Sequence, residues 1–197
     1  MAGPLIVLAS TSRYRRELLQ RLRLPFEIHA PQVDEAALPT EVPRDTALRL
    51  ARSKALQVAA SFTSAVVIGS DQTVDFDGVL LGKPLSHQAA LAQLSVLQGR
   101  TAVFYTALAM VGPSAGQMQI ACVPTTVTFR KLSQHQLDTY LHSDQPYDCA
   151  GSAKIESLGI ALIEGAVSDD PTALIGLPLI RLTSMLAEAG IQVLARS

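Results

Sequence analysis

Apolar residues are grouped along the chain in short runs that alternate with polar, turn-forming segments. Runs rich in branched side chains predict buried strands, and these cover residues 5–8, 26–33, 65–69 and 160–163. Two longer runs, 101–111 and 119–129, predict antiparallel strands joined by a turn rich in Gly, Pro and Ser. Asp77-Gly78 predicts a hairpin between two β-prone runs. The pattern therefore predicts a sheet that includes antiparallel pairs.

Helices are predicted where apolar side chains recur every three or four residues. They extend from the hydroxyl caps of Ser10–Ser12 to about residue 22, and over residues 45–60, 86–97, 133–141 and 177–189. Asp170-Pro171 is a further helix-start signal. Strands and helices follow one another without a strict βαβα order. We therefore expect one domain over residues 1–197, with a mixed-sheet α/β fold and two lobes around a central groove.

Composition and charge narrow the classes of function. The 197 residues are 48% hydrophobic and carry a formal net charge of −1. Stable nucleic-acid binding is not expected, because it depends on clustered Lys and Arg. The apolar run at 5–9 is too short for a signal peptide or a membrane span. Cys122 and Cys149 are too few for a disulfide framework. We therefore expect a cytoplasmic protein that does not associate with membranes.

A first polar cluster, residues 10–16, lies where the first strand meets the following helix. A helix N-terminus offers unpaired backbone N–H groups and a positive dipole end, which suit a phosphate group. Arg15 and Arg16 would add fork-shaped, charge-assisted hydrogen bonds to it. On spacing alone, a capped surface helix with solvated arginines explains the same residues. The Gly-rich spacing of a P-loop is missing.

A second cluster, Gly69-Ser70-Asp71-Gln72, follows a buried apolar run. A carboxylate at the end of a strand can bind Mg²⁺ or accept a proton from an attacking water. Gly-Ser-Asp is equally ordinary chemistry for a turn, so spacing alone leaves both interpretations open. Lys54 and Lys83 would suit phosphate, and Glu35 would suit a metal. Taken singly, however, these three residues are more typical of solvated surface charges.

Two further groups of residues give weaker signals. The segment 149–156 is rich in small residues, which would let the backbone approach a flat ligand closely or would simply form a turn. The four histidines (His29, His87, His135 and His142) show no metal-ligand spacing such as HExxH. A GxSxG motif for a serine nucleophile is also missing from the sequence.

Together the clusters form an ordered series of motifs that resembles the Maf family of nucleotide pyrophosphatases. Each motif is weak alone, but order and spacing agree over almost the whole chain, which makes the series specific. The series comprises Leu8–Ser12 with Arg15, Glu17 and Leu18-Leu19; Val33-Asp34-Glu35; Lys54-Ala55; Ile68–Gln72; Gly82-Lys83-Pro84; Ala150-Gly151-Ser152 with Lys154 and Glu156; and Gly176-Leu177-Pro178-Leu179.

The resemblance implies cleavage of the α–β phosphoanhydride of a nucleoside triphosphate, giving a monophosphate and pyrophosphate. It implies a divalent cation, Mg²⁺ or Mn²⁺, a two-lobed fold like that of the inosine triphosphatases, and a homodimer. By motif position, Asp71 is the catalytic acid or base and a metal ligand, and Glu35 is the second metal ligand. Four residues would bind the phosphates: Ser10, Arg15, Lys54 and Lys83. Several cations are needed there, since a triphosphate with its metal keeps a net negative charge.

Three positions bear on which nucleotide is used. The dTTP/UTP branch of the family tends to have Arg, Thr and Gln where this chain has Tyr14, Gln72 and Glu156. An ionised Glu only accepts hydrogen bonds, and guanine presents two neighbouring donors to it. N7-methylation makes the base cationic, which favours an aromatic face and a nearby carboxylate. The three residues therefore resemble the branch that acts on 7-methyl-GTP.

Alternatives remain open on the sequence alone. The enzyme could hydrolyse several modified nucleotides in a house-cleaning role, or prefer dTTP or UTP. The chain could instead be a nucleotide-binding regulator of septum formation, which needs no catalytic acid. Arg13 also replaces a proline that is usual in the family. That change either loosens the strand-to-helix turn or adds a phosphate contact.

Overall fold

A computed structural model describes residues 4–113 and 118–194. Its centre is a seven-stranded sheet in the order β2-β1-β3-β5-β6-β7, with β4 paired to β3. The strands are β1 (Ile6–Ala9), β2 (Glu27–His29), β3 (Val66–Phe76), β4 (Val79–Leu81), β5 (Thr101–Val111), β6 (Met118–Phe129) and β7 (Ile163–Ser168). β1 runs parallel to β2 and β3, whereas the pairs β3–β5, β5–β6 and β6–β7 are antiparallel. The expected mixed α/β sheet is confirmed.

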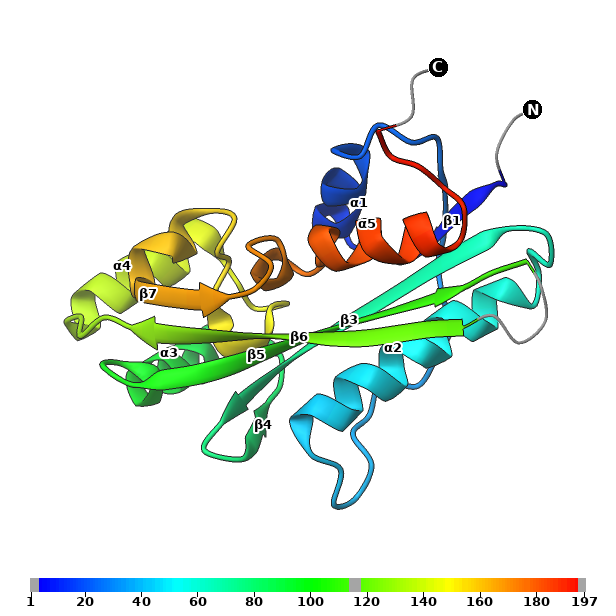
Figure 1. The fold of residues 1–197 in the computed structure, drawn as a ribbon. Coiled ribbons are helices and arrows are strands. Elements are labelled where there is room, and N and C mark those ends of the chain that lie inside the picture. Colours follow the sequence, from blue (N-terminus) through cyan, green and yellow to red (C-terminus); the bar gives the residue numbers. More distant parts are fainter. Residues whose placement is uncertain (1–3, 114–117, 195–197) are drawn as a thin grey trace.

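Five helices pack around this sheet: α1 (Arg13–Gln20), α2 (Pro43–Ala59), α3 (His87–Leu97), α4 (Gln134–Asp144) and α5 (Leu179–Glu188). Three short 3₁₀ turns complete the fold: η1 (Ala150–Ser152), η2 (Leu158–Leu162) and η3 (Ala173–Ile175). Figure 1 shows α2 on one face of the long strands, α1 and α5 on the other face, and α3 and α4 at the opposite end. Every helix in the described ranges is too short or too polar to span a bilayer.

Two separate clusters of buried apolar side chains define two lobes. The first lobe packs Leu8, Leu18 and Met185 between β1, α1, α5 and the start of β3. The second lobe packs Phe104 and Leu141 between α3, α4, β7 and the far halves of β3, β5 and β6. The three long strands run through both lobes (Figure 1). The expected division into two lobes is therefore present, and the lobes share one continuous sheet.

Several boundaries differ from those expected. Helix α2 begins at Pro43 rather than at the expected residue 45, because a proline at the first helical position costs no hydrogen bond through its missing N–H. Of the expected strand 160–163, only Ile163 is in a strand, since 158–162 form η2 and β7 begins at Ile163. Asp170-Pro171 does not begin a long helix, and α5 starts only at Leu179. The expected turn between β5 and β6 falls partly outside the described residues.

Candidate active site

Strand β3 carries the central acid, and it does not stop where the sequence suggested. Its regular pairing with β5 continues through Asp71↔Ala107 and Gln72↔Thr106. On its other edge, β1 pairs with residues 66–69 and β4 with residues 74–76. Asp71 therefore lies in the middle of a strand, just past the end of the parallel segment. The turn interpretation of Gly69–Gln72 was wrong, because a neighbouring antiparallel strand holds these residues extended.

Close packing of helix α2 on the sheet brings a lysine to this acid. A Cβ added at Gly69 would lie 2.4 Å from the carbonyl oxygen of Ala51 and 2.7 Å from the nitrogen of Ala55. Alanines from α2 and β5 (Ala47, Ala51, Ala55, Ala107 and Ala109) form the rest of this interface. Lys54 lies between Ala51 and Ala55 in the sequence, and its Nζ is 2.6 Å from Asp71 Oδ1. Both groups are almost fully buried, at 5% and 8% exposed.

The lysine is also paired with Glu35, which lies in the loop between β2 and α2. Lys54 Nζ is 2.6 Å from Glu35 Oε1, and Lys83 Nζ is 3.7 Å from Glu35 Oε2. Burial acts to raise the pKa of Glu35, but its hydrogen bond and charge interaction with Lys54 outweigh burial and lower it. Four residues that are distant in the sequence thus form one chain of alternating charge: Asp71, Lys54, Glu35 and Lys83.

The loop that carries Glu35 is held to α2 by an ion pair. Arg49 donates from Nε to Glu41 Oε1 at 2.7 Å and from Nη2 to the carbonyl oxygen of Ala36 at 2.9 Å. Hydrogen bonding from Arg49 lowers the pKa of Glu41 to about 2. Because Ala36 follows Glu35 directly, this fork fixes the loop next to the carboxylate. Neither Glu41 nor Arg49 was predicted from the sequence.

Arg15 connects the first helix to the same centre. Its Nε donates to the carbonyl oxygen of Gly176 at 2.9 Å, an oxygen that also lies 2.9 Å from the buried Ser70 hydroxyl. Burial lowers the pKa of the Arg15 guanidinium, and the charges of Asp71 and Glu35 act against that change. Gly176 has a φ of +120°, which favours glycine. The carbonyl group of Gly176 therefore holds the Arg15 guanidinium near Asp71 and Glu35.

The N-terminus of α1 is capped as expected. Ser12 accepts a hydrogen bond from the backbone N–H of Arg15, and the buried Ser10 hydroxyl accepts from the N–H of Ser12. Arg13 Nε is 2.6 Å from Glu17 Oε1 in an exposed pair one helical turn apart. The strand-to-helix turn thus forms without the usual proline, and Arg13 is paired along its own helix.

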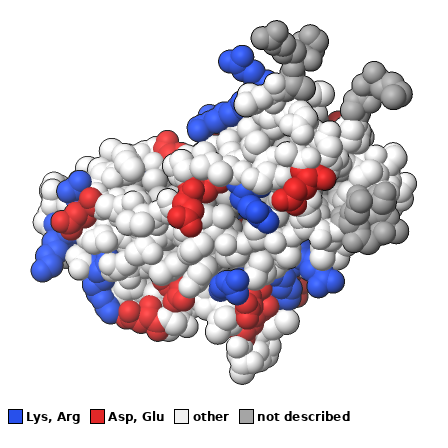
Figure 2. All heavy atoms as spheres, viewed as in Figure 1, with Lys and Arg blue, Asp and Glu red and all other residues white. Residues whose placement is uncertain are grey.

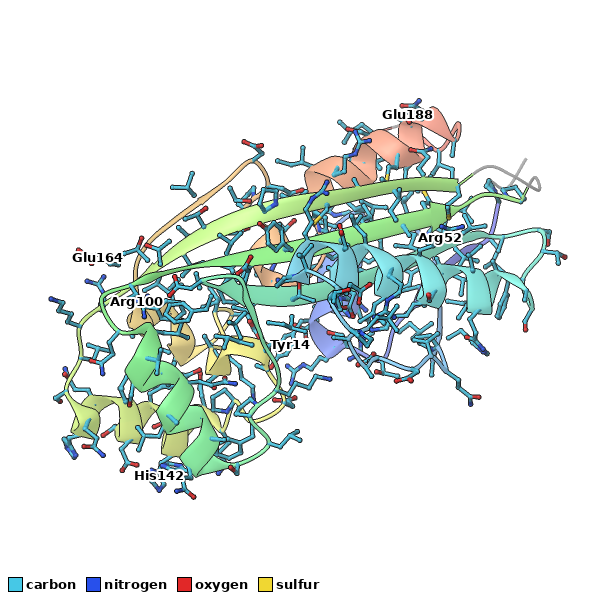
Figure 3. All side chains as sticks on the ribbon, turned by 90° about the horizontal axis from the view of Figure 1, so that it is seen from below. Tyr14, Arg52, Arg100, His142, Glu164 and Glu188 are labelled. Carbon is cyan, nitrogen blue, oxygen red and sulfur yellow. The ribbon has the colours of Figure 1, made fainter. Side chains whose placement is uncertain are left out.

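A hollow of about 320 Å³ opens beside α1 and is lined by residues of both lobes. Tyr14, Leu18 and Arg21 come from α1, Glu156 and Ser157 from the segment after η1, and Ile175 from η3. Figure 3 shows Tyr14 in the space between α1 and the turns of the second lobe. A larger hollow, about 420 Å³, lies against α2 at Leu48, Leu56 and Ile120 and contains none of the acids. The smaller hollow holds two of the three residues that the sequence predicted for selectivity, Tyr14 and Glu156.

Tyr14 and Glu156 interact across this hollow. Burial raises the pKa of the Tyr14 hydroxyl, and the charge of Glu156 raises it further. Burial also raises the pKa of Glu156, although a hydrogen bond with Tyr14 partly offsets this effect. The segment before Glu156 is fixed, since the backbone N–H of Lys154 donates to the Tyr140 hydroxyl at 2.9 Å and a Cβ on Gly159 would meet the Lys154 carbonyl oxygen at 2.3 Å.

The third predicted selectivity residue, Gln72, has a different position. Its Nε2 is 2.8 Å from Thr106 Oγ1, 3.0 Å from the Ala173 carbonyl oxygen and 3.1 Å from that of Leu174. The side chain amide thus binds the backbone of η3, and the next residue along, Ile175, lines the hollow. This geometry ties the strand of Asp71 to one wall of the hollow. It favours a positioning role for Gln72 over direct contact with a base.

Asp170 is a structural residue whose role the sequence analysis missed. Its carboxylate accepts from the backbone N–H of Thr172 and the N–H groups of Ile180 and Arg181, at 3.0, 2.7 and 3.3 Å. It therefore caps the N-terminus of α5, although it lies nine residues before that helix begins. The segment 171–178 connects Asp170 to the helix. Asp170-Pro171 was predicted to start a helix, and Asp170 is indeed a helix cap. A local motif could not show, however, that Asp170 caps a helix that begins several residues later.

The donor set at the centre fits a hard divalent cation. Asp71 and Glu35 each place one carboxylate oxygen 2.6 Å from the same Lys54 ammonium, so both can reach one small cation. Carboxylate oxygens are the ligands that Mg²⁺ and Mn²⁺ prefer, with the remaining positions left to phosphate oxygens and water. The residues Lys54, Lys83 and Arg15 supply positive charge around these acids. The arrangement can bind a metal-bound polyphosphate and accept a proton beside it.

Comparisons with known proteins point to one family. A family model described as "Maf-like protein" matches residues 5–189. A relative from Ralstonia nicotianae is 58% identical over 183 residues, 93% of this chain and 94% of its own. A relative from Thiobacillus denitrificans is 56% identical over 192 residues, 98% of this chain and 96% of its own. Both relatives are named "7-methyl-GTP pyrophosphatase".

Among solved structures, the Ham1 protein of Staphylococcus aureus has a TM-score of 0.47 and 16% identity, covering 64% of this chain and 71% of its own. The family model spans nearly the whole chain, and the two relatives share more than half of its residues over almost their full length. The chain therefore belongs to the Maf family.

Proposed function

We propose that this protein hydrolyses 7-methyl-GTP to 7-methyl-GMP and pyrophosphate, removing a modified nucleotide in a house-cleaning role. The observation that carries the proposal is the pairing of two sites on adjacent residues of α1. Arg15 points to the cluster of Asp71, Lys54 and Glu35, whereas Tyr14 lines the hollow that contains Glu156. A nucleotide can therefore place its phosphates beside Arg15 and its base beside Tyr14 at one helix N-terminus. The names of the two relatives support the same substrate.

In the proposed mechanism, Asp71 is the general base. Its carboxylate accepts a proton from a water that attacks the α-phosphorus, and pyrophosphate leaves. Lys54 holds this carboxylate in place at 2.6 Å. Arg15 and Lys83 bind phosphate oxygens and offset the charge that develops on the leaving group. When bound, a divalent cation, Mg²⁺ or Mn²⁺, supplies Lewis-acid polarisation of the phosphate oxygens.

Selectivity in this proposal comes from Glu156 and Tyr14. The ionised Glu156 accepts hydrogen bonds from N1–H and the 2-amino group of guanine. Tyr14 presents an aromatic ring to the cationic 7-methylated base. Both groups are close enough to influence one another's pKa, so a base that reaches one is expected to meet the other. Gln72 supports this pocket through η3.

Location and assembly are part of the same proposal. A nucleoside triphosphate substrate places the enzyme in the cytoplasm, and the two cysteines among the described residues are free thiols. Figure 2 shows acidic and basic side chains mixed over the face that it draws, without a continuous basic surface among the described residues there. Such a face is in keeping with a small-molecule substrate. The homodimer remains a prediction that light scattering would test.

A panel of nucleoside triphosphates tests the proposal directly. The full-length protein is incubated with 7-methyl-GTP, GTP, dTTP and UTP in excess Mg²⁺ or Mn²⁺, and pyrophosphate release is measured. We expect the highest kcat/KM for 7-methyl-GTP. A preference for dTTP or UTP would contradict the proposed substrate but would still support the proposed reaction. Similar rates for all bases would indicate an enzyme with a broad range of substrates. Tight binding without pyrophosphate release would instead support a nucleotide-binding regulator of septum formation.

A further inference from the structure

A second group of potential ligands lies at the outer end of the second lobe. His87 is the first residue of α3, and Asp138 and His142 lie one turn apart on α4. One ligand atom from each of the three residues lies within 4.8 Å of the others. His87 Nε2 is 2.7 Å from Asp138 Oδ1, and the two imidazole rings are 4.6 Å apart at their centroids. Figure 3 shows His142 where α3 and α4 come together, far from α5.

Tyr147 fixes the orientation of the His87 ring. The Tyr147 hydroxyl donates to the carbonyl oxygen of Leu141 at 3.2 Å, which uses its single proton. With the hydroxyl proton on the Leu141 oxygen, His87 Nδ1 donates its N–H to the hydroxyl oxygen over 3.1 Å, and Nε2 is left without a proton in the neutral ring. Such an outer hydrogen bond is the usual partner of a histidine that binds a metal through its other nitrogen. The Nε2 atom faces the Asp138 carboxylate, so either a proton or a cation must lie between them.

We propose that His87, Asp138 and His142 form a binding site for a divalent transition-metal ion of the Zn²⁺ class. Two imidazoles and one carboxylate are common zinc ligands, with a fourth position left to water. Ligand atoms around a tetrahedral zinc are about 3.3 Å apart, given bonds of about 2.0 Å. His87 Nε2 is 2.7 Å from Asp138 Oδ1, and His142 Nδ1 is 3.5 Å from Asp138 Oδ2. Because His142 Nδ1 also donates to the backbone carbonyl oxygen of Asp138 at 2.9 Å, His142 would bind the metal through Nε2, with its Nδ1–H as the outer hydrogen bond.

The site is separate in position and chemistry from the proposed catalytic centre. Asp71 and Glu35 offer only oxygen ligands, which favour Mg²⁺ or Mn²⁺, whereas imidazoles favour Zn²⁺. A metal at His87 would fasten the start of α3 to α4 and would stabilise the second lobe. His142 is exposed, so an ion has access from solvent. Sequence spacing alone missed this group, because one of its ligands comes from another helix.

Zinc titration by calorimetry, in excess Mg²⁺ to occupy the oxygen ligands, tests the site. We expect one Zn²⁺ per chain in the full-length protein, and a loss of affinity of at least about 10-fold in His142→Ala. His135→Ala is the matched control, since His135 is exposed on the same helix and outside the group, and it should bind like the unchanged protein. Asp71→Asn should also keep the site.

Thermal unfolding gives a second readout. Zn²⁺ should raise the Tm of the unchanged protein and of His135→Ala, but not that of His142→Ala, because a ligand stabilises only the state that binds it. The proposal would be overturned by no Zn²⁺ binding to the unchanged protein or by equal binding to His142→Ala. Loss of binding in Asp71→Asn alone would move the zinc to the catalytic centre and would likewise overturn it.

Discussion

Helix α1 contributes one residue to each of two sites, Arg15 to the centre formed by Asp71, Lys54 and Glu35 and Tyr14 to the hollow that contains Glu156, yet the two sites are built differently. Asp71 and Lys54 project from the middle of a long strand and a long helix, which touch closely at Gly69. Glu156 lies in an irregular segment between η1 and η2, and it faces Tyr14 across the gap between the lobes. The centre is buried and cross-linked by ion pairs, whereas the hollow is open to solvent.

Because of this difference, we expect the two sites to have different roles. Groups on packed, regular elements hold their positions within narrow limits, which proton transfer and phosphate binding require. Groups on connecting segments can change with little effect on the core, and they are well suited to setting selectivity. We therefore expect changes at the centre to affect every substrate and the stability of the fold. Changes in the hollow should affect mainly the choice of base.

The largest expected effect is that of Asp71→Asn. The amide cannot accept the proton of the attacking water, so kcat should fall by about 1,000-fold for every nucleotide triphosphate. Pyrophosphate release measures kcat, and circular dichroism checks that the variant is folded. If the variant kept more than about a tenth of the activity, Asp71 would not be the base.

A comparison of two lysines tests how far the centre supports the fold. Lys54→Met leaves Asp71 buried without its cation, and the free energy of unfolding should fall by about 3 kcal/mol. Lys83→Met removes an exposed partner of Glu35 and should cost less than about 1 kcal/mol. Urea unfolding of both variants gives the values. Equal losses would mean that burial of the Lys54 pair does not matter for stability.

Glu156→Gln should alter selectivity while leaving the chemistry in place. Loss of a charged acceptor should lower kcat/KM for 7-methyl-GTP by about 10-fold or more, relative to other substrates. Burial raises the pKa of Glu156, so acidification should weaken the preference for 7-methyl-GTP at a pH above the usual range for glutamate. The ratio of rates for 7-methyl-GTP and GTP, measured against pH, follows this titration. If the ratio measured for Glu156→Gln still varied with pH in this way, the titration would belong to another group.

The smallest expected effect concerns the loop that carries Glu35. Glu41 has a lowered pKa of about 2, so its pairing with Arg49 stabilises the fold above pH 4.5, the ordinary value, and loses this effect as the pH falls toward 2. Glu41→Gln should therefore lower the free energy of unfolding by about 1 kcal/mol at neutral pH. The gap between variant and unchanged protein should close in acid. A gap that is constant with pH would show that ionisation of Glu41 does not contribute.

Sequence patterns were enough for the elements with strong local signals. The hydroxyl caps at Ser12, Ser86 and Ser133 begin helices as expected, and the two long antiparallel strands have nearly their expected bounds. Contacts between distant segments could not be predicted from local patterns. The continuation of β3 through Asp71 depends on its pairing with β5, and the position of Lys54 depends on Gly69 and the alanines of α2.

In the site, too, some residues were predicted from sequence motifs, whereas the roles of others depend on contacts between distant segments. Motif order named Asp71, Lys54, Glu35 and Lys83 together, and the structure brings these four into one charged chain. Gln72 was expected to choose the base, but its amide is bound to Thr106 and the backbone of η3. Which way a side chain on a strand points, and what it meets, depends on the register of that strand. The roles of Glu41 and Asp170 were missed for the same reason.

The most direct test of separate roles for Asp71 in catalysis and Glu156 in selectivity measures two variants with two substrates. kcat/KM is determined for Asp71→Asn and Glu156→Gln, each with 7-methyl-GTP and with GTP. We expect Asp71→Asn to lower both values by the same large factor. We expect Glu156→Gln to lower the ratio of 7-methyl-GTP to GTP, while GTP hydrolysis stays within a few-fold of the unchanged enzyme. A Glu156→Gln variant that loses both activities equally would contradict these separate roles.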